Sequence, residues 1–256
     1  MRLKINKDGK ESVYTMINSW SDVTLDKWVR LIGYKEKTKS QEAIHTINVL
    51  SDIPKKVIQE LSINDIANIL QRIAKMQEEE NSKLKRVIKI NDVEYGFHPN
   101  LEEITLGEYA DIETYLKNGI ENNLHKLMAV LYRPITEKDG KNYSIEAYGK
   151  SDINMRAAKF YKMKAQDVNS SLVFFLDFRE RVVNDFAAVF NGTQSGDTEQ
   201  SADEQFADKW GWFGVMYRLT NGEIINLERI TNLSLYECLT WLTYETDLNE
   251  TKAVKK

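Results

Sequence analysis

Two stretches decide how this chain folds: residues 22–31 read DVTLDKWVRL, and residues 103–112 read EITLGEYADI. Each places a threonine directly before an apolar helical pattern, where its hydroxyl can accept a hydrogen bond from a free amide of the first turn. Val23 and Ile104 stand just before Thr24 and Thr105, where an apolar residue packs back onto the helix. These stretches therefore predict two helices that start in the same way.

A predicted β-hairpin precedes each helix start. Residues 1–18 alternate apolar and polar side chains around a KDGK turn at positions 7–10. Residues 86–98 repeat this pattern around Asn91 and Asp92. The same supersecondary unit, a hairpin followed by a helix, is therefore expected twice.

The correspondence continues downstream of the two caps. Residues 44–47 read IHTI and residues 124–127 read LHKL, and Pro54 and Pro134 follow each in turn. The numbering of these pairs is offset by 80, whereas that of the two threonines is offset by 81. We interpret residues 1–135 as two divergent copies of one unit, a hairpin with a capped helix pair. The alternative is coincidence between two ordinary amphipathic segments.

The remaining segments are expected to be mostly helical. Residues 62–81 carry apolar residues at helical spacing, and residues 135–145 suggest a short hairpin. Residues 154–190 form a long apolar helical pattern that includes Phe174, Phe175 and Phe178. Such a helix forms either the centre of a core, which we favour, or the seam of an oligomer.

The C-terminal part is predicted to be a separate helical module behind a linker. Residues 191–205 are rich in Gly, Ser, Thr and acidic residues, as is typical of linkers. The module that follows has three expected helices: one carrying Phe206 to Tyr217, a short one around Leu227, and one capped by Ser234. About fifty residues make a marginal core, so Trp210, Trp212 and Trp241 are expected to dock the module onto the main body or another subunit.

The expected fold class is mainly α, within α+β, with two tandem hairpin-and-helix units, a long apolar helix and a C-terminal three-helix module. The expected boundaries are 1–84 and 85–150 for the units, 151–190 for the long helical segment, 191–205 for the linker and 206–250 for the module. Candidate partner-binding residues are the aromatic side chains on these helices: Trp28, Tyr109, Phe174, Phe175, Phe178, Trp210, Trp212 and Trp241.

Composition argues against several classes of partner. The net charge of −4 comes from interleaved acidic and basic residues, so no electrostatic footprint for nucleic acid or an anionic membrane is present. No uninterrupted apolar run approaches the length of a membrane span, and residues 1–11 lack the apolar core of a signal peptide. The single cysteine, Cys238, stands among leucines and is expected to be a buried small side chain.

Signatures of catalysis and metal binding are missing from the sequence. The three histidines are His45, His98 and His125, and the first and third occupy matching places in the two copies, which favours packing over catalysis. The sequence contains no HExxH, CxxC, Walker A, GxGxxG or GxSxG motif. We therefore expect a protein that is not an enzyme and binds no cofactor or metal.

Several of these segments resemble proteins from the structural gene modules of tailed bacteriophages. The resemblance is carried by residues 97–109 and 123–134, and by residues 172–175 and 206–244. These are similar to the group of tail-assembly chaperones and baseplate-assembly proteins, in which a hairpin precedes a small helical bundle. Two copies of the unit in one chain depart from the simplest pattern of that group.

The resemblance implies a role in phage assembly in the host cytoplasm. A chaperone of this kind would bind a structural protein stoichiometrically, such as the tape measure or a tail or neck subunit. The competing interpretation is a permanent virion component, such as a neck, ring or tail subunit or a protein packaged in the head. Copies of such a subunit would contact one another symmetrically, as a homo-oligomer.

Overall fold

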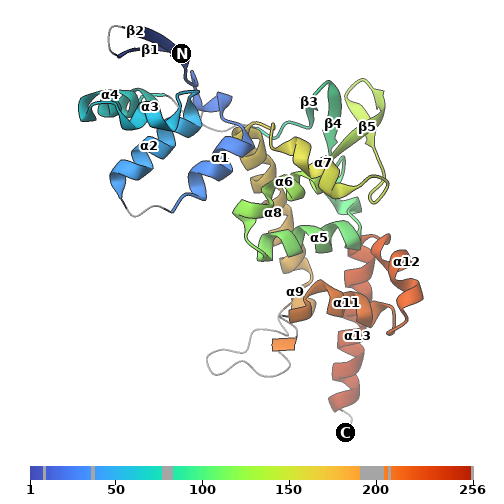
Figure 1. Cartoon of the computed structure of the whole chain (residues 1–256). Helices are drawn as coiled ribbons and strands as arrows, with labels where there is room; N and C mark the ends of the chain where they lie inside the picture. Colours follow the sequence, from blue (N-terminus) through green and yellow to red (C-terminus); the bar gives the residue numbers. More distant parts are fainter. Residues whose placement is uncertain (8–9, 36–37, 77–82, 191–204, 207–208, 255–256) are drawn as a thin grey trace.

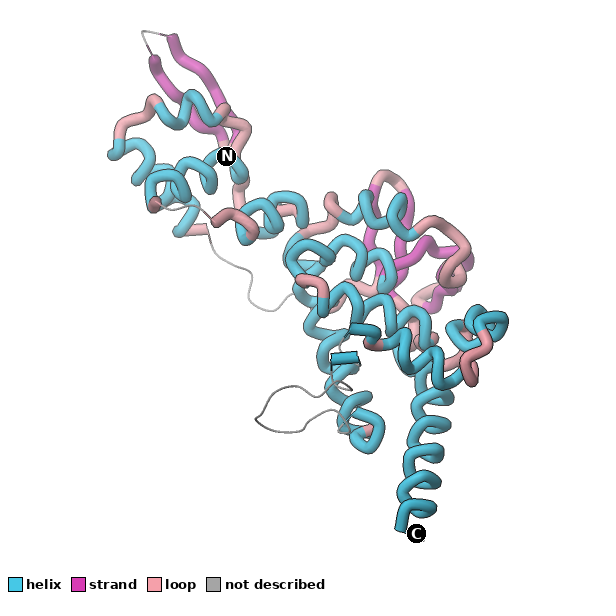
Figure 2. The backbone as a smooth tube through the Cα atoms, turned by 60° about the horizontal axis from the view of Figure 1, so that its bottom comes forward, coloured by secondary structure: helices cyan, strands magenta, loops and turns pink. Residues whose placement is uncertain are grey.

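A computed structural model describes residues 1–7, 10–35, 38–76, 83–190, 205–206 and 209–254. The described chain is mainly helical, with two small antiparallel sheets. The molecule is elongated: the N-terminal hairpin and the free end of the last helix lie at opposite ends in both views (Figures 1 and 2). The expected mainly α, α+β class is thereby confirmed. The linker predicted at 191–205 lies outside the described residues except at position 205.

The first unit begins with the predicted hairpin and capped helix pair. Strands β1 and β2 pair in register from Arg2 opposite Thr15 to Lys7 opposite Lys10. Thr24 is the N-cap residue of α1, but its side chain does not make the expected capping hydrogen bond, and two further helices follow the pair. In chain order the elements are β1 (Arg2–Lys7), β2 (Lys10–Thr15), η1 (Trp20–Asp22), α1 (Leu25–Ile32), α2 (Lys39–Leu50), α3 (Lys55–Gln59) and α4 (Ile63–Ala74). The predicted helix at 62–81 thus ends at Ala74, and residues 77–81 lie outside the described ranges.

The second unit repeats this order and adds two strands. Asn91 and Asp92 both have positive φ, the backbone that a tight two-residue hairpin turn requires. The chain then forms a four-stranded sheet in the order β3-β4-β5-β6. Its elements are β3 (Val87–Ile90), β4 (Val93–Phe97), η2 (Leu101–Glu103), α5 (Leu106–Lys117), α6 (Ile120–Leu131), β5 (Tyr132–Asp139) and β6 (Asn142–Ile145).

Backbone pairing fixes which residues of the two units correspond. Met16 pairs with Ser51 in the first unit, and Phe97 pairs with Tyr132 in the second, so both partners are offset by 81 in the numbering. The first and last positions of α2 and α6 show the same offset. The offset of 80 expected from the IHTI and LHKL motifs is therefore short by one position. His45 and His125 therefore do not occupy matching places. The motifs also align at an offset of 80 because both helices are rich in apolar residues.

Each capping threonine also pairs with a segment far along the chain. Thr24 bridges Lys164, and Thr105 bridges Ser234. The flanking hydrogen bonds are the same at both places. They run from Leu25 N to Met163 O (2.8 Å) and Ala165 N to Val23 O (2.9 Å), and from Leu106 N to Leu233 O (2.9 Å) and Leu235 N to Ile104 O (2.9 Å). The helices after Lys164 and Ser234 are thereby anchored to the first and second unit respectively.

The pattern at 154–190 is interrupted rather than continuous. It forms α7 (Ile153–Phe160), α8 (Ala165–Asp185) and α9 (Ala187–Phe190). The break falls where Lys164 adopts an extended backbone to pair with Thr24. Helix α8 is amphipathic rather than apolar all round, since Phe175, Phe178 and Val182 are buried. Its exposed side carries charged residues together with Val173 and Leu176. It therefore serves as a core helix.

The C-terminal module packs on the second unit. It comprises α11 (Trp212–Leu219), η4 (Ile224–Asn226), α12 (Leu227–Thr231) and α13 (Leu235–Val254). Helix α11 begins at Trp212, so Phe206 and Trp210 precede it. Asn221 and Gly222 follow its end with positive φ, as their sequence suggests. Leu235, Cys238, Leu239 and Leu242 on α13 join the main core.

Two hydrophobic clusters hold the described chain together. One contains residues of the first unit, from Leu3 to Ile73. The other contains the second unit, α7, α8 and α13, and it also takes in Leu25 of α1. Helix α1 thus contacts both clusters and joins the first unit to the rest of the molecule.

Candidate functional site

The side of the C-terminal module that faces the body is closely packed. The Trp212 ring lies 5.2 Å from the ring of Tyr109 on α5 in an edge-to-face arrangement. Gly107 of α5 lies so close to Thr231 that an added Cβ would stand 3.0 Å from the Thr231 carbonyl oxygen. Trp212 therefore docks the module onto the body, and the other faces of the module are left for solvent or a partner.

A row of exposed aromatic side chains lies on that outer side, and we call it the aromatic ladder: Phe206, Trp210 and Phe213. Their exposed fractions are 63 %, 43 % and 51 %. Successive ring centroids are 6.2 Å and 5.6 Å apart, so the three rings form one continuous surface. Contiguous exposed apolar surface of this kind marks a site of protein–protein contact more often than scattered single residues do.

A second exposed row lies on α13, and we call it the α13 stripe: Trp241, Tyr244 and Leu248. The spacing of three and four residues places these side chains on one helix face. Trp241 and Tyr244 are 64 % and 61 % exposed, and their rings are 6.5 Å apart. The buried leucines of α13 occupy a different face, so this helix is apolar on two sides. The last turns of α13 project away from the body (Figure 1).

Three of the predicted partner-binding residues lie in the core instead of on the surface. Tyr109, Phe175 and Phe178 are at most 1 % exposed. The Tyr109 ring packs 6.1 Å from Phe175, which in turn lies 6.1 Å from Phe178. A partner cannot reach these side chains on the folded chain, so we assign them to packing. Burial and the nearby negative charge of Glu113 also raise the pKa of Tyr109.

The other predicted residues divide between packing and exposure. Phe174 is half-buried, with its ring 5.6 Å from Phe97. Trp212 is half-buried in the docking contact described above. Trp28 remains 38 % exposed on α1, and Trp210 and Trp241 belong to the two exposed rows. The accessible candidates are thus Trp28, Trp210 and Trp241.

Sequence reasoning misses most members of the two exposed rows. It places Phe206 and Phe213 on a helix face without assigning them to a partner, and it does not single out Tyr244 or Leu248. A usable signal is present in α13: its apolar residues form two separate stripes, and a single packed surface can cover only one of them.

A buried charged cluster sits between α5 and the second sheet. Arg133 Nη1 lies 2.5 Å from Glu108 Oε1, and both side chains are almost fully buried. Glu108 Oε2 also accepts a hydrogen bond of 2.8 Å from the Thr105 amide, which completes a capping box. His98 Nε2 lies 3.8 Å from the same carboxylate, and burial lowers the pKa of His98. Glu108 is therefore committed to capping α5 and pairing Arg133.

A second arginine extends this cluster without opening it. Arg156 Nε donates to the Ala129 carbonyl at 3.0 Å, and its Nη1 contacts Ser151. Arg133 lies with its guanidinium carbon 5.8 Å from the centre of the Tyr148 ring. These contacts tie α5, α6, α7 and β5 together. Paired buried charges of this kind specify one arrangement of elements, and here they support a structural role.

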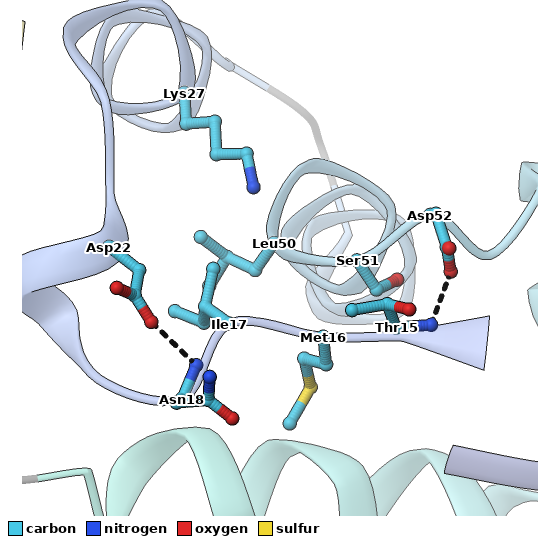
Figure 3. Close-up of a pocket in the computed structure, with 9 residues that line it drawn as sticks. All are labelled: Thr15, Met16, Ile17, Asn18, Asp22, Lys27, Leu50, Ser51 and Asp52. Carbon is cyan, nitrogen blue, oxygen red and sulfur yellow. Dashed lines mark hydrogen bonds between the residues drawn. The ribbon is translucent and has the colours of Figure 1, made fainter. Parts of the chain in front are cut away.

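The corresponding place in the first unit is an open hollow of about 530 Å³ (Figure 3). Ser51 and Asp52 stand there in place of the larger Tyr132 and Arg133, which explains the free space. Asp52 accepts from the Thr15 amide at 2.6 Å, and Asp22 accepts from the Asn18 amide at 3.0 Å. Lys27 extends into the hollow from α1, and no carboxylate of the described residues lies within ion-pair distance of its ammonium.

The described part of the chain also bears on metal binding, on the reactivity of Cys238 and on membrane-spanning helices. No group of three or more His, Cys, Asp or Glu side chains there is placed to hold a metal ion. Cys238 is buried as expected, and burial raises the pKa of its thiol to about 11, which disfavours the thiolate. None of the helices within the described ranges has the length and hydropathy needed to cross a bilayer.

Comparison with protein-family models, with curated proteins and with solved structures finds no match to the chain. Function must therefore be argued from the surfaces described above.

Proposed function

We propose that this chain is a non-catalytic binding protein whose aromatic ladder contacts a structural protein. The observation that carries the proposal is the exposure of three adjacent aromatic rings whose centroids are within 6.2 Å of the next ring in the row. Trp and Tyr dominate the energetic centres of protein interfaces because they bury a large area with little loss of side-chain entropy. Leaving such rings in water is unfavourable unless a partner covers them.

We further propose that the two hairpin-and-helix units are divergent copies of one scaffold. Support comes from the matching order of hairpin, 3-10 turn and helix pair, from the common offset of 81 in the numbering, and from the equivalent backbone hydrogen bonds beside Thr24 and Thr105. A duplicated scaffold of caps and packed helices builds a rigid body rather than a catalytic site. On this view the unmatched aromatic ladder confers the binding activity.

The specific role proposed is that of a tail-assembly chaperone of a tailed bacteriophage, acting in the host cytoplasm. Support comes from the sequence resemblance and from the presence of an exposed aromatic surface on the segment that carries part of it. Its partner would be a phage structural protein such as the tape measure, bound stoichiometrically. Neither nucleic acid nor membrane is proposed as a partner, and no enzymatic activity or cofactor is proposed.

The second candidate is a permanent virion component, either a neck, ring or tail subunit or a protein packaged in the head. The α13 stripe favours this candidate, because a projecting helix with an uncovered apolar face suits a contact that persists in an assembly. Both candidates share a stoichiometric, non-catalytic mode of action.

Mass spectrometry of purified phage particles separates the two candidates. We expect a chaperone to be absent from mature virions, and abundant presence would refute the transient role. Absence would refute the permanent one. Quantification against the major tail protein gives the copy number, because an assembled ring subunit must be present in a fixed symmetric number.

A binding experiment tests the aromatic ladder directly. The chain is co-expressed with the tape-measure protein of the same phage, and the complex is purified and titrated. Trp210→Ala and Phe213→Ala should each weaken binding by about tenfold or more, as expected at the centre of an interface. Ile63→Ala is the matched control, since Ile63 on α4 is 85 % exposed but lies outside the ladder. Equal affinities for all three variants would refute the proposed surface.

A further inference from the structure

Helix α1 presents an apolar face that its counterpart α5 keeps covered. Trp28 and Tyr109 occupy matching places in the two units, but Trp28 is 38 % exposed and Tyr109 is fully buried. The cover on Tyr109 comes from Trp212 of α11 and Phe175 of α8. One turn beyond Trp28, Ile32 is 42 % exposed. We call Trp28 and Ile32 the α1 stripe.

The C-terminal helix α13 also has an exposed apolar face. The α13 stripe is apolar and uncovered, while the opposite face of α13 packs against η2, α5 and α9 of its own chain. Within one chain, α8 and α6 contact α1 as α13 contacts α5, and Trp28 and Ile32 remain exposed beyond these contacts. The free face of another α13 can cover them.

Charge favours the same pairing. Lys27 beside the α1 stripe has no ion-pair partner among the described residues, and neither Glu237 nor Asp247 beside the α13 stripe has one. The imbalance extends to the ends of the chain: residues 1–60 contain eleven basic and eight acidic residues, and residues 191–256 contain six basic and eleven acidic ones. Helix α1 itself carries Lys27 and Arg30 against Asp26, and α13 carries four acidic residues against Lys252, so opposite net charge favours this contact.

The two stripes cannot meet within one molecule. Figure 1 shows α1 beside α8, on the side of the first unit, whereas the projecting half of α13 extends away from the body at the other end of the molecule. We propose that the α13 stripe of one copy of this chain covers the α1 stripe of a second copy. The contact is head-to-tail, and it goes beyond the ladder-mediated binding proposed above because it uses neither Trp210 nor Phe213.

A head-to-tail contact leaves one free stripe of each kind on every pair. Such a contact closes into a ring or continues as an open chain, unlike a two-fold contact that stops at a dimer. Neither Trp28 nor Ile32 lines the hollow of about 530 Å³, so the proposed contact does not involve that hollow.

The proposal is tested by light scattering coupled to size-exclusion chromatography on the full chain. We expect the average mass of the wild-type protein to rise above the 29.7 kDa of one chain as its concentration increases. Trp28→Ala and Trp241→Ala, studied separately, should each remain at the mass of one chain. Both side chains are partly exposed, and unchanged thermal unfolding will verify that each variant is folded.

Mixing the two variants gives the decisive result. Trp28→Ala retains a working α13 stripe and Trp241→Ala retains a working α1 stripe, so an equimolar mixture should form pairs of twice 29.7 kDa and nothing larger. Mixtures that stay at the mass of one chain would overturn the proposal. Self-association of Trp28→Ala alone would overturn it as well, because that outcome means that α13 pairs with α13.

Two further variants serve as controls. Met155→Ala is the matched control, because Met155 is 74 % exposed on α7 outside both stripes; it should associate like the wild type. Trp210→Ala should also associate normally, so a failure of the ladder proposal leaves this test intact. A wild-type protein that keeps the mass of one chain at every concentration would refute self-association outright.

Discussion

Helices α1 and α5 occupy corresponding places in the two units, each behind a threonine cap and a short 3-10 turn. Their surroundings differ at two neighbouring pairs of matched positions. Tyr109 is enclosed by Phe175 and Trp212, whereas Trp28 faces solvent. Glu108 forms a buried ion pair with Arg133, whereas Lys27 at the matching position extends into the open hollow. Similar local sequence therefore starts the same helix, and distant segments decide whether that helix becomes core or surface.

The largest expected difference lies at the two aromatic positions. Tyr109→Ala removes a fully buried ring and should lower the free energy of unfolding by about 3–5 kcal/mol, as large-to-small core substitutions do. Trp28→Ala should lower it by less than about 1 kcal/mol, because the ring is partly in water already. Urea unfolding of both variants measures this. Equal losses would mean that α1 and α5 are covered to the same extent.

The charged positions give the next comparison. Glu108→Gln keeps the size of the side chain but leaves Arg133 as an unpaired buried cation, which should cost about 3 kcal/mol. Lys27→Gln should change the free energy of unfolding by at most about 0.5 kcal/mol, since its ammonium has no described partner. The measurement is again chemical denaturation. A loss for Lys27→Gln as large as that for Glu108→Gln would contradict the open hollow.

The caps themselves should differ by a smaller amount. The Thr105 hydroxyl accepts from the Glu108 amide at 3.2 Å, whereas the Thr24 side chain makes no capping hydrogen bond. Thr105→Ala should therefore cost about 1 kcal/mol and Thr24→Ala about 0.5 kcal/mol or less. Thermal unfolding followed by circular dichroism resolves the two. The reverse order would contradict the difference in cap geometry between the units.

The smallest expected effect is on the pH dependence of stability, through His98 in the buried charged cluster. Burial lowers the pKa of His98 below its ordinary value of 6.5, so below that pH the unfolded chain takes up a proton that the folded chain resists. Stability from this source is complete above that value and is lost as the pH falls toward the folded pKa. We expect His98→Leu to show a shallower decline on acidification than the wild type. His125 is shifted in the same direction in both proteins and cancels.

Features set by neighbouring residues could be predicted from the sequence. Both helices begin where they are expected, although only Thr105 makes the expected side-chain cap. The hairpin turn at Asn91 and Asp92 and the burial of Cys238 also follow from short-range chemistry and are present as expected. The break before α8 could not be predicted, because no Pro or Gly marks it. It exists because Lys164 pairs with Thr24, a contact between residues far apart in the sequence.

The candidate site was predictable only in part for the same reason. Aromatic residues at helical spacing indicate an apolar face, but they do not reveal what packs on it. Tyr109 and Trp28 have equivalent sequence patterns, and only the position of α11 separates a core residue from an exposed one. Exposed surface is a property of the assembled fold, so the ladder and the α13 stripe became visible only in the structure.

The pairing of each cap with a distant segment also governs how the chain can fold while it is being made. Thr24 cannot form its backbone pairing until Lys164 has been synthesised, and Thr105 cannot form its pairing until Ser234 has been synthesised. At ribosomal speeds of about 5–20 residues per second, the first wait lasts roughly 7–28 s. During that interval the Leu25 amide lacks its Met163 partner. The first unit can bury its own cluster, from Leu3 to Ile73, during this interval, so it can form before the contact that joins it to α8 exists.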